Sequence, residues 1–191
     1  MNGMHRVRYV FTAVVVLCVA ALACGPGLAS PTPPGSPIPV TTEAAGQLES
    51  AWQTAVASPQ NGQVTVVMTE QQLTSYAALK LAANPQSPIQ NPQIFLRNGQ
   101  MSIYGTAKAN SVVLPIAIAL SVAPAADGTV SVTIQSISFG PLPAPASLRD
   151  TLTSTLNQLI SGQVTSGNSN FKVTDIKIGD GQMTVTGTIA Q

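Results

Sequence analysis

The sequence predicts a fold of the α+β class, in which about seven strands are segregated from two or three amphipathic helices. We expect the strands to pair antiparallel with their neighbours in sequence. Segments of alternating apolar and polar residues are joined by short turns, as is typical of antiparallel hairpins. Three other segments repeat apolar residues at three- and four-residue spacing, as helices do. One hairpin pattern also occurs twice: NGQMSIYGTA at 98–107 is similar to DGQMTVTGTI at 180–189.

The first 23 residues are predicted to be a lipoprotein signal peptide. Arg6 and Arg8 precede an apolar run at 9–23, which is shorter than the roughly 20 residues that a membrane-spanning helix needs. Ala21-Leu22-Ala23-Cys24 resembles a bacterial lipobox, whose cysteine receives fatty acyl groups such as palmitate. We therefore expect lipidated Cys24 to anchor the protein at the extracytoplasmic face of the cell membrane. A conventional signal peptide cleaved near Ala29, or an uncleaved anchor, is the alternative.

The lipidated cysteine is followed by a proline-rich stretch, so residues 24–42 are predicted to form an anchor and its tether. Residues 25–42 hold six prolines and three glycines, a composition that neither continues a helix nor joins a sheet. Extended, this stretch would hold a domain a few nanometres from the membrane. The remaining residues, 43–191, are enough for one domain with a single core.

The charged and nucleophilic residues exclude several function classes. Six basic and seven acidic side chains leave the part after Cys24 with a net charge of −1 and no basic cluster, which disfavours nucleic-acid binding. The only histidine, His5, and the only cysteines, Cys18 and Cys24, lie in the predicted signal peptide or at its cleavage site, so the domain that follows has neither residue type. We therefore predict no catalytic residues, no metal site and no cofactor, and hence no enzyme. Asp175 and Asp180 lie close in sequence, but a strand irregularity and a hairpin turn explain them better than acid–base chemistry does.

The first half of the domain is predicted to begin with a helix from Thr41 to just before Pro59, with Trp52 on its inner face. A strand at 63–68 follows. Thr69 and Gln72 then match a capping box, which predicts a helix over 70–83. The three prolines in 84–93 predict a loop.

The second half is predicted to be mostly strands. The turn at Asn98-Gly99 joins strands at 94–97 and 100–107, and a long strand covers 111–123. Strands at 129–139 and 171–178 each change the parity of their apolar residues, which predicts a bulge or a sharp coiling of the strand. A helix is expected over 145–161, and Asp180-Gly181 turns the chain into a final strand at 182–190.

The repeated hairpin is predicted to be scaffold. In each copy two inward residues alternate, and a glycine lies where a curved sheet needs a bend. These residues are Met101, Ile103 and Gly105 in the first copy, and Met183, Val185 and Gly187 in the second.

Four segments together resemble the LmeA-like phospholipid-binding family and the related YpmS-like bacterial lipoproteins. They are VVMTEQQLTSYAALKL, IFLRNGQMSIYG, DGTVSVTIQSISFGPLPAPASLRDTL and VTDIKIGDGQMTVTG, and the resemblance covers about residues 62–189. The matching positions are Thr69-Glu70 with Leu73, Asn98-Gly99 with Gly105, Gly140-Pro141 with Pro143, and Asp180-Gly181 with Gly187.

The resemblance implies a strongly curved sheet wrapped against the helices, similar to tubular lipid-binding folds, with phospholipid or another apolar ligand held by its acyl chains in an apolar groove. The candidate lining comes from the bulky face of the long strand and from the third helix: Leu114, Ile116, Ile118, Leu120, Leu152, Leu156 and Leu159. The alternative is that these residues form a solid core, in a structural or interaction lipoprotein without a ligand.

Overall fold

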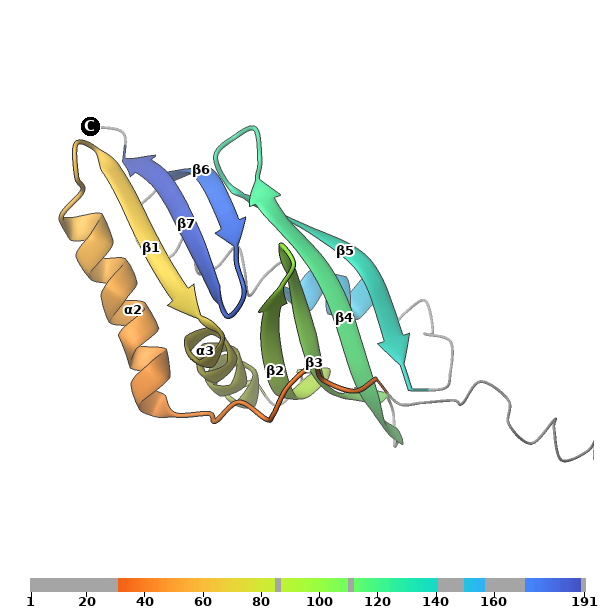
Figure 1. Cartoon of the computed structure of the whole chain (residues 1–191). Coiled ribbons are helices and arrows are strands. Elements are labelled where there is room, and N and C mark those ends of the chain that lie inside the picture. The colour runs from red at the N-terminus through yellow and green to blue at the C-terminus, as the bar shows by residue number, and fades with distance from the viewer. Residues whose placement is uncertain (1–30, 85–86, 110–111, 141–149, 157–170, 190–191) are drawn as a thin grey trace, which may run out of the picture.

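The computed structural model describes residues 31–84, 87–109, 112–140, 150–156 and 171–189. It confirms the α+β class, with seven strands in two antiparallel sheets that lie side by side (Figure 1). The elements are α2 (Thr42–Ala57), β1 (Gln63–Thr69), α3 (Glu70–Ala82), β2 (Ile89–Arg97), β3 (Gln100–Ala109), β4 (Val112–Pro124), β5 (Val130–Phe139), β6 (Phe171–Ile178) and β7 (Gln182–Ile189). Residues 150–156 are also helical.

The strands do not all pair with their neighbours in sequence. One sheet has the order β1-β7-β6 and the other β2-β3-β4-β5, so the last strand returns to pair with the first, Val185 opposite Val66. The expectation of sequential partners is wrong at β1 because α3 starts directly after this strand and carries the chain to a second sheet. The edge of β1 is thereby left for β7.

Local turn and bulge predictions are confirmed. Asn98 and Gly99 both have positive φ, 52° and 75°, as the two-residue turn requires. The register shifts within β5, opposite Ala119/Leu120, and within β6, between Val173 and Asp175, account for the two parity changes.

The prediction of a loop over 84–93 is wrong in its second half, because β2 already begins at Ile89. As an edge strand, β2 accommodates Pro92 in an irregularity of its register.

The helices begin where the sequence predicts. Thr41 caps α2, and Thr69 and Gln72 form the complete capping box at α3. Of the helix expected at 145–161, residues 150–156 are helical and the others lie outside the described residues. None of the helices in the described ranges is long and apolar enough to cross a membrane.

The core lies between the inner faces of the sheets and the helices. Trp52 of α2 packs edge-on against Phe171 of β6, with 5.3 Å between the ring centroids. Two hydroxyls of α3, on Thr74 and Ser75, are also fully buried. Thr74 Oγ1 accepts a hydrogen bond from the backbone N–H of Ile94 at 2.9 Å, so α3 is tied to β2 by a polar contact inside the core.

The end of the proline-rich stretch is fastened to the domain. Gln93 Oε1 accepts from the N–H of Ile38 at 2.6 Å, and Gln93 Nε2 donates to the carbonyl of Ile38 at 3.2 Å. The N–H of Thr41 donates to Ser75 Oγ at 3.1 Å. We call residues 38–41 the strap, because these bonds hold them against β2 and α3 ahead of the first turn of α2.

Candidate functional site

An apolar cavity of about 100 Å³ lies between the helices and both sheets. Its strand side is formed by alternate residues, which the two-residue period of a strand places on one inner face. These residues are Met68 on β1, Ile94 on β2, Met101 and Ile103 on β3, and Met183 and Val185 on β7. All six are buried.

The repeated sequence therefore contributes to this cavity from both sheets. Met101 and Ile103 in the first hairpin occupy the positions that Met183 and Val185 occupy in the second, and all four line the cavity. Methionine is unbranched and polarizable, so its side chain adapts its shape more readily than Leu or Ile. With Met68 included, three methionines give the strand side a deformable surface.

The helix side consists of Leu48 and Trp52 from α2 with Leu73, Tyr76 and Ala77 from α3. Helical spacing of three and four residues brings the members of each set onto one face. Leu48 is buried, whereas the other four are half-buried. The cavity is completed by half-buried Val122, Val130 and Ile176 and by buried Leu156 of the 150–156 segment.

Of the residues predicted to line a groove, Leu156 lines this cavity. Ile116, Ile118, Leu120 and Leu152 are at most 1% exposed and pack in the hydrophobic core, while Leu114 is half-buried outside the cavity lining. Cys24 and Leu159 lie outside the described residues. β4 lies between β3 and β5 in the sheet, and the bulky face of its middle packs against the hydrophobic core. The groove assignment of these residues stays a prediction.

Sequence reasoning missed most of the cavity lining. It followed the longest aliphatic strand, whereas the cavity forms where the two sheets and the helices meet. The matched inward pairs of the repeat were the available signal, because residues in equivalent places on two hairpins line the same space when those hairpins face each other.

Two charged groups of the helices lie next to the cavity residue Tyr76 or to each other. Lys80 Nζ lies 5.1 Å from the ring centroid of Tyr76 and 3.6 Å from Glu49 Oε1. Burial raises the pKa of Tyr76, opposed by the charge of Lys80. Within the described ranges no group of three His, Cys, Asp or Glu side chains is placed to hold a metal ion. An apolar space with a polar rim is suited to holding a hydrocarbon ligand.

A second, more open groove of about 510 Å³ lies beside the strap. It is bounded by Val40, by the end of α3 including Ala78 and Leu79, and by the start of β2 including Asn91 and Gln93. Its lining mixes amide and apolar side chains, so it differs in chemistry from the cavity between the sheets.

Comparison with known proteins supports a lipid-related assignment. The model of a family described as LmeA-like phospholipid-binding matches residues 37–188, about four fifths of the chain. The match starts at the strap and includes every described element up to β7, so the strap is part of the shared domain. It agrees with the resemblance drawn from the motifs. No curated protein matches the chain.

Proposed function

This chain belongs to the LmeA-like phospholipid-binding family, and from that premise we propose that it is a non-catalytic lipoprotein that holds a phospholipid by its acyl chains. The ligand site is the apolar cavity between the two sheets and the helices. Cys24 is the anchor, at the extracytoplasmic face of the cell membrane.

The apolar cavity carries the proposal. Its lining side chains are apolar apart from the hydroxyl of Tyr76 and the indole N–H of Trp52, and they come from both sheets and from all the described helices. Its volume of about 100 Å³ is below the roughly 300–1,000 Å³ of small-molecule sites, so an acyl chain has to widen it. The side chains of the three methionines and of the half-buried helix side can move to widen the cavity with the smallest loss of packing.

The gain from filling this space comes from the hydrophobic effect. Each methylene transferred from water contributes about 0.8 kcal/mol, so a few methylenes offset a modest rearrangement of side chains. A chain transferred from a bilayer gains much less, because it already lies in hydrocarbon. The protein is therefore suited to taking up lipid and returning it, without trapping it permanently.

The anchor is supported by the sequence around Cys24 and by the place of the strap. Since residues 38–41 are fastened to the domain, the tether between the anchor and the domain is shorter than residues 25–42. Even if all of residues 25–37 were extended, at roughly 3 Å per residue they would reach at most about 40 Å. This length keeps the domain near the bilayer that would supply its ligand.

The ligand assignment is tested with a pair of substitutions on neighbouring positions of α3. Ala77 lines the cavity between the sheets, whereas Ala78 lines the groove beside the strap. Ala77→Phe places a ring in the cavity and should reduce the phospholipid that co-purifies with the protein, measured by mass spectrometry. Ala78→Phe should leave that amount unchanged. Equal lipid content in both variants, or none in the wild type, would contradict the proposal.

The anchor is tested separately by growth with labelled palmitate. The wild-type chain should incorporate the label and remain with the membrane fraction, and Cys24→Ala should lose both properties. Labelling that survives Cys24→Ala would rule out this residue as the attachment site, without bearing on the cavity.

The alternative function, a structural or interaction lipoprotein without a ligand, is favoured by one observation. Ile116, Ile118, Leu120 and Leu152 fill the space that sequence reasoning had assigned to the groove. If the small cavity stays empty in protein that has been offered labelled lipid vesicles, this alternative replaces the lipid-binding proposal.

A further inference from the structure

Three polar side chains lie together beside the helix side of the cavity. Glu49 is three residues before Trp52 on α2, and Lys80 is four residues after Tyr76 on α3, so each charged residue shares a helix face with a cavity residue. The Lys80 ammonium lies 3.6 Å from Glu49 and 5.1 Å from the centre of the Tyr76 ring. Tyr76 thus belongs both to the cavity wall and to the charged pair.

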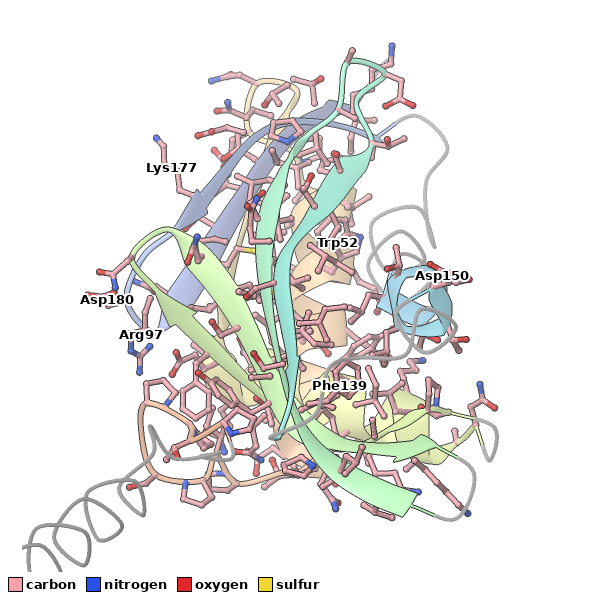
Figure 2. The ribbon with its side chains drawn as sticks, turned by 90° about the vertical axis from the view of Figure 1, so that its right-hand side faces the viewer. Trp52, Arg97, Phe139, Asp150, Lys177 and Asp180 are labelled. Atoms are coloured by element: carbon pink, nitrogen blue, oxygen red, sulfur yellow. The ribbon has the colours of Figure 1, made fainter. Side chains whose placement is uncertain are left out.

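The other cations in the described ranges face away from the cavity. Arg97, Lys108, Lys172 and Lys177 are on strands, next to inward residues such as Leu96, Ala107, Val173 and Ile176. In Figure 2 Lys177 points to the outer side of the sheet, opposite to Trp52. Lys80 is the cation that the described helices carry.

The charged pair can also be rearranged at little cost. Both side chains of the pair are about half exposed, and surface pairs of this kind contribute roughly 0–1 kcal/mol to stability. A ligand with one negative and one positive charge could pair with Lys80 and Glu49 respectively, so that neither side chain is left with an unpaired charge. A ligand with only a negative charge would gain from Lys80 and be repelled by Glu49.

We infer that Glu49, Tyr76 and Lys80 form the headgroup site of the lipid cavity, and that they select a zwitterionic phospholipid with an ammonium group. The inference rests on the proposed function. The phosphate lies against the Lys80 ammonium and the Tyr76 hydroxyl, because both can donate hydrogen bonds to its oxygens. The ammonium of the headgroup lies against the Glu49 carboxylate. The acyl chain continues past Tyr76 and Trp52 into the cavity.

The inference is tested by competition among lipids with identical acyl chains. The full chain is purified in detergent and offered equal amounts of phosphatidylethanolamine, phosphatidylglycerol and diacylglycerol. Bound lipid is then counted by native mass spectrometry. The wild type should prefer phosphatidylethanolamine. Lys80→Gln should reduce both phospholipids relative to diacylglycerol by about tenfold, the size expected for a lost charge-assisted hydrogen bond.

Glu49→Gln should shift the ratio of the two phospholipids towards phosphatidylglycerol by about tenfold, because it removes the repulsion. Tyr76→Phe keeps the ring and should weaken only the two phospholipids. Lys177→Gln, on the outer face, is the matched control and should change no ratio.

The outcomes separate this inference from the function beneath it. If the wild type binds all three lipids equally, or if the variants keep the wild-type ratios, the headgroup site is wrong while lipid binding stands. If the wild type binds none of the three, the lipid-binding function fails and the headgroup site fails with it.

Discussion

The backbone N–H of Asn98 donates a hydrogen bond to Asp180 Oδ1 at 3.3 Å, which brings the tips of the two repeated hairpins into contact. Asn98 and Asp180 are equivalent positions of the repeat, 82 residues apart. The N–H of Gly181 also donates to the carbonyl of Leu96 at 3.0 Å, and Figure 2 shows Arg97 and Asp180 at this same tip. We call this contact the tip junction. Another hydrogen bond links the two sheets away from this junction, where the N–H of Val173 on β6 donates to the carbonyl of Gly128, just before β5, at 2.7 Å.

Glu70 is predicted to stabilise the tip junction. Its Oε1 accepts from the backbone N–H of Leu96 at 2.6 Å and from the guanidinium of Arg97, and its carboxylate is only 15% exposed. Glu70→Ala should lower the free energy of unfolding by about 1–3 kcal/mol, because the Leu96 N–H loses its acceptor. Urea denaturation measures this change.

Glu43 provides the matched control for Glu70. It is also an acidic residue in the first turn of a helix, but it is exposed and contacts only Gln47 among the described hydrogen bonds. Glu43→Ala therefore removes the same helix-dipole interaction without touching the junction. Equal losses in the two variants would show that the contacts of Glu70 with Leu96 and Arg97 contribute nothing.

Position 187 is predicted to tolerate only glycine, because β6 lies too close to it to leave room for a side chain. A Cβ at this position would lie 2.3 Å from the Phe171 ring and 2.5 Å from the Lys172 carbonyl oxygen. Gly187→Ala should therefore lower the melting temperature by several degrees, since overpacking costs about 1–3 kcal/mol. Gly46→Ala, on the exposed face of α2 with no atom within 4 Å, should raise it instead by removing a helix glycine. A harmless Gly187→Ala would contradict the packing described here.

Gln93 is predicted to hold the strap in place. Gln93→Ala removes both hydrogen bonds to Ile38, so the segment before α2 should become more accessible. Limited proteolysis should then cut within residues 31–41 several times faster than in the wild type, as local opening becomes easier. Gln90→Ala, an exposed glutamine of the same strand, should not change the rate. Equal rates in both variants would mean that the two bonds do not limit opening.

Tyr76 is predicted to make stability fall at alkaline pH. Its pKa is raised by burial, so the folded state favours the neutral phenol and holds its proton to higher pH than the unfolded chain does. This pKa difference contributes fully to the free energy of unfolding below the pKa of the unfolded chain, about 10, and the contribution is lost as the pH rises through the pKa of the folded protein. Urea denaturation across this range should show a smaller alkaline loss for Tyr76→Phe than for the wild type. Tyr104→Phe, which leaves Tyr76 in place, should keep the loss that Tyr76 causes.

The local parts of the fold could be predicted because their causes are local. The capping box of Thr69 and Gln72 acts across three residues, and the Asn98-Gly99 turn depends on the φ angles of two. The bulges in β5 and β6 left a readable change of parity in a single strand. The start of β2 was missed because Pro92 signals a loop, and only the position of the strand at a sheet edge makes a proline acceptable there.

The candidate site was harder to predict, because burial depends on what covers a side chain. Ile118 and Leu120 were predicted from their strand to line a groove, and in the fold both are buried in the hydrophobic core. Conversely, Tyr76 showed nothing unusual in sequence, and Met183 was predicted only to face inward as part of the scaffold, yet both line the cavity.

The class of the fold, the helix starts and turns, the repeated hairpin and the family could be predicted, because the patterns that indicate them each lie in short segments of the chain. The pairing of β7 with β1, the contact of the hairpin tips at Asn98 and Asp180, and the position of Lys80 beside Glu49 depend on the tertiary structure. These contacts join residues dozens of positions apart. Their geometry follows from the packing of whole elements, which no local pattern records.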